Sequence, residues 1–151
     1  MLPVLYNNHY QFVQTPGYLM IVVEMVHDVR VIPLDGRPHA PASIRKWLGD
    51  SVGHWEGETL VVATTNFNEN VSFRGSSPAL HVIERFTRVD AETILYKFTV
   101  DDPETFSTPW SGEIPLRATD ELMYEYACHE ANHSLEGILR GARFGEKMKS
   151  R

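Results

Sequence analysis

The order of apolar and polar residues along the chain predicts a mainly β protein. Short runs rich in Val, Ile, Phe and Tyr recur at close intervals and are separated by turn residues, which is the pattern of successive strands. We expect strands over residues 18–26, 29–34, 59–67, 80–89, 93–100, 106–116 and 122–128. Most of their connections are too short for a parallel crossover, so neighbouring strands are expected to pair antiparallel, as a meander.

Outside these strands the pattern predicts two helices and one irregular segment. Residues 42–48 carry a short apolar stripe and are followed by Gly49, a common helix stop, so a short helix is expected there. In residues 134–148 apolar side chains recur with helical spacing, which predicts a C-terminal helix packed against the outside of the sheet. Residues 1–17 are expected to be an irregular arm.

Several short strands joined by tight turns favour a closed sheet. An antiparallel barrel of lipocalin or calycin type removes the unpaired edges of such a sheet, and this is the fold that we expect. The alternative is a half-open α+β cone in which helices cover one face. A chain of 151 residues is long enough for a single core, so residues 1–151 are expected to form one domain, with the sheet or barrel over residues 18–128.

Composition and charge exclude some classes of partner. The chain has 20 acidic and 14 basic residues and a net charge of -6, whereas nucleic-acid binding relies on Lys and Arg, so no nucleic-acid partner is expected. No apolar run approaches the roughly 20 residues of a membrane-spanning helix. Residues 1–5 lack a charged leader, so the sequence as it stands predicts no secretory signal and a cytoplasmic location.

Two carboxylic acids occur at apolar positions of the predicted strands. Glu24 and Glu84 alternate with apolar residues and are expected to face the core, where burial raises the pKa of a carboxyl group and suits it to proton transfer. The alternative is that each Glu pairs with an arginine, for which Arg30 and Arg85 are the candidates. The candidate proton-transfer and orienting residues are Glu24, His27, Arg30, Glu84 and Glu125.

The segment 124–133 is the densest part of the chain in reactive side chains. Adjacent strand residues point to opposite faces, so Cys128 and His129 are not expected to form a nucleophile and base. His129 and His133 have the spacing of two ligands on a helix but lack a longer zinc signature, so we expect neither a metal nor another cofactor. The candidate substrate-binding residues are Trp47, Trp110, Tyr124, Tyr126, His81 and His129.

Three segments resemble those of a large group of uncharacterised bacterial proteins. They are residues 31–39 (VIPLDGRPH), 47–62 (WLGDSVGHWEGETLVV) and 124–132 (YEYACHEAN). Members of that group are typically longer at the N-terminus and often carry an export signal. The resemblance therefore implies that this chain is a short form or a C-terminal piece of a periplasmic or secreted protein, and it leaves an upstream disulfide partner open for Cys128. The chain departs from the group at Ala131, where Gly is usual, and at His133, where an aromatic residue is usual.

These patterns support three functional hypotheses. The first is a cofactor-independent enzyme that uses acid–base chemistry, of lyase, isomerase or hydrolase type, on an apolar, aromatic or glycosidic small molecule. The second is a non-catalytic carrier of a hydrophobic small molecule, with Trp47 and Trp110 as walls of the cavity. The third is an interaction module, such as a homodimer, that uses the basic residues near the C-terminus or an open sheet edge.

Overall fold

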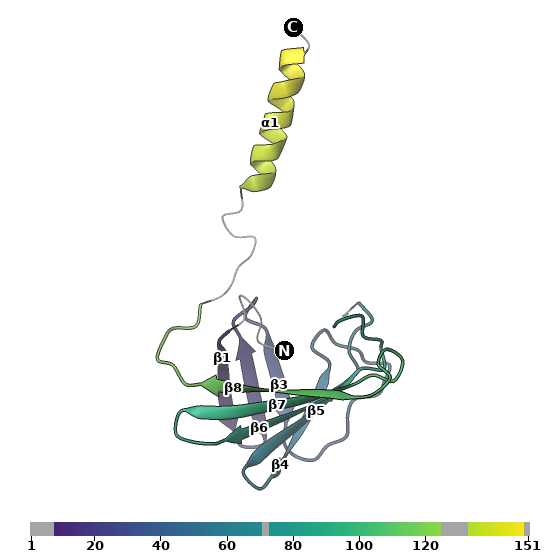
Figure 1. Ribbon diagram of the computed structural model, residues 1–151, viewed down its shortest axis with the longest axis vertical. Helices are drawn as coiled ribbons and strands as arrows, with labels where there is room; N and C mark the ends of the chain where they lie inside the picture. The colour runs from purple at the N-terminus through teal and green to yellow at the C-terminus, as the bar shows by residue number, and fades with distance from the viewer. Residues whose placement is uncertain (1–7, 71–72, 125–132, 150–151) are drawn as a thin grey trace.

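The computed structural model describes residues 8–70, 73–124 and 133–149. In these residues the chain forms two antiparallel sheets and a C-terminal helix (Figure 1). The first sheet has the order β1-β2-β3 and consists of β1 (Tyr10–Thr15), β2 (Tyr18–Val23) and β3 (Val29–Pro33). The second has the order β4-β5-β6-β7-β8 and consists of β4 (Asp50–Glu56), β5 (Thr59–Thr65), β6 (His81–Arg88), β7 (Thr93–Asp101) and β8 (Trp110–Arg117). The helix α1 spans Ser134–Lys149.

The predicted mainly β character and the antiparallel meander are confirmed. No closed barrel is found in the described part of the chain, because β3 and β4 are not hydrogen-bonded to each other and the meander is split into two sheets. Two strands were not predicted. Residues 10–15, expected to be irregular, form β1, and residues 50–56, whose pattern is interrupted by Gly53, form β4.

Three other expected elements differ from the structure. Residues 42–48 contain no helix, because the backbone of Lys46 is hydrogen-bonded to the segment that follows β5. The Lys46 N–H donates to Asn66 O, and the Lys46 carbonyl accepts from the Asn68 N–H. The strand expected over 106–116 begins only at residue 110. Of the strand expected over 122–128, residues 122–124 are irregular and the remainder lies outside the described residues.

The helix α1 confirms the predicted C-terminal helix but not its packing. Its large apolar side chains are exposed rather than covered by a sheet: Leu135, Ile138, Leu139, Phe144 and Met148. The prediction that this helix packs against the outside of the sheet is therefore wrong for the structure described. The helical period fixes which side chains share a face, but it does not specify a partner for that face.

The two sheets bury their facing sides in one core. In β7 the even positions predicted to face inward, Ile94, Tyr96, Phe98 and Val100, belong to the core or pack against it. Gly53 sets how closely the sheets approach, since a Cβ there would lie 2.8 Å from Leu34 Cδ2 and 3.0 Å from Ile32 Cγ2. A larger residue at this position would push β3 away from β4. Gly112 likewise allows a close contact within the second sheet, because the ring of Phe98 lies over it. A Cβ added to Gly112 would lie 2.6 Å from Phe98 Cζ.

A buried aspartate fixes the loop between β5 and β6 to the end of β7. Asp102 is 1% exposed and accepts hydrogen bonds from the Ser77 N–H (2.6 Å) and the Ser77 hydroxyl (2.7 Å). Burial raises the pKa of Asp102, but these donors lower it by more, so the pKa lies below its ordinary value. The ionised form is thus the one that stabilises the fold.

We expect Asp102→Asn to reduce the free energy of unfolding at neutral pH by about 1–3 kcal/mol, because the donors of Ser77 lose a charged acceptor. A carboxyl group whose pKa is lower in the folded state stabilises the protein above its unfolded pKa, and the effect is lost as the pH falls through the folded pKa. The difference between wild type and variant should therefore shrink towards acid pH in denaturant titrations. A difference that is constant with pH would show that ionisation of Asp102 is not the cause.

Candidate functional site

A buried ion pair links the two sheets. Arg30 on β3 donates through Nη1 to Glu84 Oε1 (3.0 Å) and through Nη2 to Glu84 Oε2, and the two residues are 5% and 1% exposed. Nη2 also donates to Ser51 Oγ and Thr64 Oγ1, both at 3.1 Å. The Tyr96 hydroxyl donates to Glu84 Oε1 at 3.0 Å. The alternative raised from the sequence, that Glu84 pairs with Arg30, is confirmed.

The electrostatics of this cluster hold Arg30 in its charged form. Burial lowers the pKa of Arg30, but the Glu84 carboxylate raises it by more, so the net shift is upward. Burial, followed by the charge of Glu84, raises the pKa of Tyr96 well above its ordinary value, so its hydroxyl stays protonated and continues to donate. Glu84 is therefore an acceptor for at least three N–H or O–H groups, and it is engaged in structure rather than open to a substrate.

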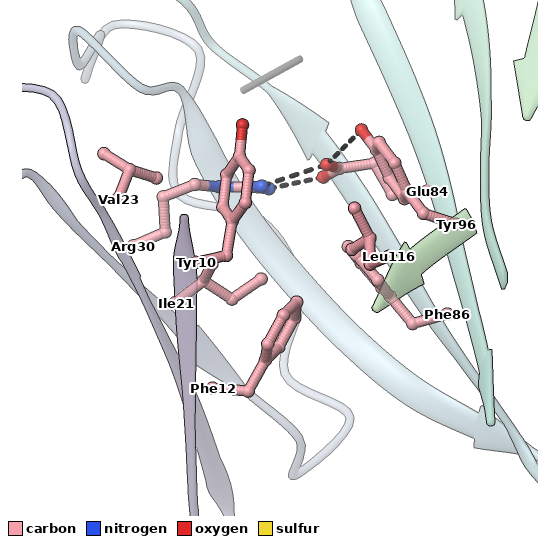
Figure 2. A pocket seen from close by; sticks show the side chains of 9 residues that line it. All are labelled: Tyr10, Phe12, Ile21, Val23, Arg30, Glu84, Phe86, Tyr96 and Leu116. Atoms are coloured by element: carbon pink, nitrogen blue, oxygen red, sulfur yellow. Dashed lines mark hydrogen bonds and ion pairs between the residues drawn. The ribbon is translucent and has the colours of Figure 1, made fainter. Parts of the chain in front are cut away.

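A small cavity lies beside the ion pair (Figure 2). Figure 2 shows Tyr10 and Arg30 projecting from the first sheet towards Glu84 and Tyr96 of the second. The cavity is lined by Tyr10, Phe12, Ile21, Val23, Arg30, Glu84, Phe86, Tyr96 and Leu116. The volume open to the centre of a water molecule is about 10 Å³, the lower limit for a single water. The space between the sheets is thus nearly filled by side chains at this point and cannot enclose a substrate.

A much larger groove opens where the edge of the first sheet faces the edge of the second. Its volume is about 490 Å³, within the usual range for small-molecule sites. Strand β1 forms one side with Tyr10 and Phe12, and strands β7 and β8 form the other. The lining residues are Asn8, His9, Tyr10, Phe12, Arg88, Ala91, Glu92, Thr93, Ile94, Ile114, Pro115, Leu116, Arg117, Ala118 and Thr119. Tyr10, Phe12 and Leu116 line both spaces, so the small cavity adjoins the groove, and we refer to it as the inner end of the groove.

One of the residues that line the groove, His9, contacts a carboxylate. His9 Nδ1 lies 3.3 Å from Glu24 Oε1, and Glu24 Oε2 accepts from the Asn8 N–H at 2.9 Å and the His9 N–H at 3.3 Å. The Asn8 N–H, together with His9, lowers the pKa of Glu24 despite some opposing burial, so the predicted upward shift is wrong for this residue. Glu24 is an ionised carboxylate that orients the His9 ring. The other ring nitrogen, Nε2, lies 3.7 Å from Glu121 Oε2.

The structure brings together only part of the predicted site. Arg30 and Glu84 form the buried pair, whereas Glu24 does not line the groove and contacts it only through His9. His27 is exposed in the turn between β2 and β3 and does not line either space. The predicted participation of His27 with the core acids is therefore not supported by its position. Glu125 lies outside the described residues.

The predicted substrate-binding residues are dispersed. Trp47 and Tyr124 are 64% and 70% exposed, and neither lines the groove or the small cavity. Trp110 packs on the rings of Phe73, Phe98 and Phe106 and does not line the groove. His81 lies on β6, and burial, aided by the charge of His39, lowers its pKa. Tyr126 and His129 lie outside the described residues.

None of the residues that line the groove was a predicted site residue, and those in and just before β1 were also assigned to the wrong kind of structure. His9, Tyr10 and Phe12 were assigned to an irregular arm because the first fifteen residues are rich in Asn, Gln and His. The signal was present but short: Tyr10 and Phe12 alternate with Gln11, and both face inward from β1. Six residues with partial alternation are too few to predict a strand from the sequence alone.

Neither a metal cluster nor a membrane-spanning helix is found in the described residues. They contain no group of three or more His, Cys, Asp or Glu side chains placed to hold a metal ion. None of the helices in this part of the chain has the length and apolar character required to cross a membrane.

Comparison with known proteins assigns the chain to no group. No family model, no curated protein and no solved structure matches it.

Proposed function

We propose that the protein binds an apolar small molecule in the groove between β1 and β8. The observation that carries the proposal is a groove of about 490 Å³ whose walls include the apolar side chains of Phe12, Ile94, Ile114 and Leu116. Burial of apolar ligand surface at about 25 cal/mol per Å² supplies the binding energy. Polar residues at the rim, such as His9 and Arg117, keep the open side solvated.

The position of the groove distinguishes this mode of binding from that of a closed lipocalin-like barrel. In such a barrel the ligand lies inside a sealed sheet, whereas here it would lie between two sheets at an open side, flanked by the edge strands β1 and β8. Open edges also attract other strands, so a homodimer is the competing occupant. Light scattering of the purified chain separates the two: a monomer in which the groove binds ligand favours the small molecule, and a dimer that excludes ligand favours the second copy.

Binding without chemistry is the function that the geometry supports best. The acid predicted to be catalytic in the core, Glu84, already accepts hydrogen bonds from Arg30 and Tyr96. The three donors on Arg30 and Tyr96 occupy three of the roughly four acceptor positions of a carboxylate, and Glu84 is 1% exposed, so it is poorly placed to take a proton from a substrate. The carrier hypothesis therefore takes precedence over an enzyme that works through Glu84.

A charge placed in the groove is expected to weaken binding. Ile114→Glu should weaken the affinity for butylbenzene at least about tenfold, because ligand binding would then desolvate a carboxylate. Val31→Glu is the matched control, since Val31 is 53% exposed on the outer face of β3. Calorimetric titration of wild type and both variants, with circular dichroism to confirm folding, measures the effect. Equal losses in both variants, or none in either, would contradict a site in the groove.

The pair of His9 and Glu24 favours catalysis as a second candidate function. Glu24 Oε1 accepts from His9 Nδ1–H in one tautomer, which leaves a lone pair on Nε2 beside the groove, 3.7 Å from Glu121 Oε2. With a bound ketone, Nε2 would remove a proton from the carbon next to the carbonyl to give an enolate, and would then return a proton to the same carbon. This cycle exchanges the hydrogen at that carbon, inverts the carbon if it is a stereocentre, and consumes no co-reactant.

Deuterium exchange tests this second candidate. If His9 acts as the base, the protein should accelerate exchange of the hydrogens next to the carbonyl of benzylacetone in D₂O, followed by proton NMR. His9→Gln should then reduce the acceleration at least about tenfold, since acid–base groups typically contribute factors of 10²–10⁴. Glu24→Gln should reduce it by less, because the ring remains and only its orientation is lost. Exchange in the presence of wild type no faster than in buffer excludes the candidate.

A further inference from the structure

The inner end of the groove has the size of one small chemical group. About 10 Å³ is open there, the lower limit for one water molecule, so a single oxygen atom can enter but a ring cannot. Phe12, Leu116 and Tyr10 line both the groove and this space. A ligand held in the groove can therefore extend one terminal group towards the buried ion pair.

Charge at the inner end restricts what that group can be. The positive charge of Arg30 is already neutralised by the Glu84 carboxylate, which also lines the cavity. A second carboxylate brought into the same buried space would be repelled by Glu84 and would lose its hydration. The site thus disfavours an anionic group and accepts a neutral one.

A ligand group that enters the inner end should be a hydrogen-bond acceptor, because the protein groups there include donors. The guanidinium of Arg30 has five N–H donors, and its contacts to Glu84, Ser51 and Thr64 all come from Nη1 and Nη2. Within the described residues the buried Nε of Arg30 has no hydrogen-bond partner. Burial and the charge of Glu84 raise the pKa of Tyr10 to about 12, so its hydroxyl also stays protonated at neutral pH. The surroundings are therefore rich in donors.

We propose that the groove selects neutral apolar molecules that end in a small hydrogen-bond acceptor, such as a ketone, aldehyde or alcohol oxygen, which accepts from Arg30 Nε–H. The inference rests on the proposed function and adds the class of ligand to it. The apolar body of the molecule fills the groove, and its terminal oxygen fills the inner cavity. A ligand lacking that oxygen leaves the buried donor unpaired.

Three probes with related carbon skeletons test the class: benzylacetone, butylbenzene and phenylbutyrate. The ketone should bind about tenfold more tightly than the hydrocarbon, as expected for one recovered buried hydrogen bond, and the carboxylate should bind most weakly. Equal affinity of ketone and hydrocarbon would overturn the inference and leave the proposed function standing. Preference for the carboxylate would also overturn it. If none of the three probes binds, both the inference and the proposed function are contradicted.

Nitrogen-15 NMR of the side-chain N–H groups supplies a local readout in wild type. Benzylacetone should shift the Arg30 Nε–H resonance and slow its exchange with solvent, whereas butylbenzene should shift only the methyl groups of the groove. Arg30→Lys keeps a cation for Glu84 but lacks Nε–H, so it identifies the resonance by its loss and should bring the ratio of the two affinities close to one. An Arg30 resonance that does not respond to saturating ketone would contradict the proposal, whether or not the variant folds.

Discussion

Glu84→Gln is expected to lower the free energy of unfolding by about 3–5 kcal/mol, the usual range when a buried ion pair loses one partner. The substitution keeps the shape of the side chain but removes the charge that neutralises Arg30, which is 5% exposed. Ser51 and Thr64 offer only neutral hydroxyl oxygens to the guanidinium. An uncompensated cation would therefore remain between the two sheets. Urea denaturation, monitored by circular dichroism, measures the loss.

The double variant Arg30→Met/Glu84→Met is the control for this prediction. Replacing both members of a buried pair by apolar residues of similar volume is often neutral or stabilising, because the cost of desolvating two ions disappears. The double variant should therefore recover most of the stability lost in Glu84→Gln. If it is as unstable as the single variant, the loss arises from packing and the charge argument for the pair is wrong.

Phe98→Ala is expected to lower the free energy of unfolding by about 3–5 kcal/mol, the usual range for truncating a buried aromatic ring. The Phe98 ring packs edge-on against Trp110, with centroids 5.7 Å apart, and lies 5.7 Å from the ring of Tyr96. It also covers Gly112, which has no side chain that could fill the space. The neighbours cannot close the resulting cavity without moving β8. Thermal and urea denaturation give the magnitude.

Phe98→Leu separates ring contacts from simple burial. It keeps most of the apolar volume, so it should cost about 1 kcal/mol. Adding Gly112→Ala to Phe98→Ala should restore part of the stability, because the new methyl group occupies space vacated by the ring. An unchanged double variant would mean that Gly112 is required for its backbone rather than for its contact with Phe98.

Local alternation was enough to predict the middle of the second sheet. In β7 every second residue from Ile94 to Val100 is apolar, which places Tyr96 and Phe98 on the buried face without knowledge of the fold. In β6, Glu84 alternates with the apolar residues Val82 and Phe86 and is placed on the buried face in the same way. The pairing of Glu84 with an arginine also follows from physical chemistry, because a carboxylate on such a face needs a partner. The choice of Arg30 over Arg85 follows from the same period, since Arg85 points to the opposite face of β6.

The remaining features depend on contacts between distant residues. The meander splits into two sheets between β3 and β4, and the two sheets pack closely at Gly53. In the sequence this glycine only weakens the strand pattern. The groove arises because β1 faces β8, strands that are separated by most of the chain. The lowered pKa of Glu24 depends on the Asn8 N–H, which lies sixteen residues away. No pattern of neighbouring residues in the sequence predicts any of these contacts.

The most direct test of a ligand site in the groove is the set of intermolecular nuclear Overhauser effects from bound benzylacetone to methyl-labelled protein. A ligand between the sheets predicts contacts to the methyl groups of Ile94, Ile114 and Leu116, and none to Val29 or Val31 on the outer face of β3. Contacts confined to that outer face or to the exposed apolar side chains of α1 would contradict the site, as would the absence of saturable binding.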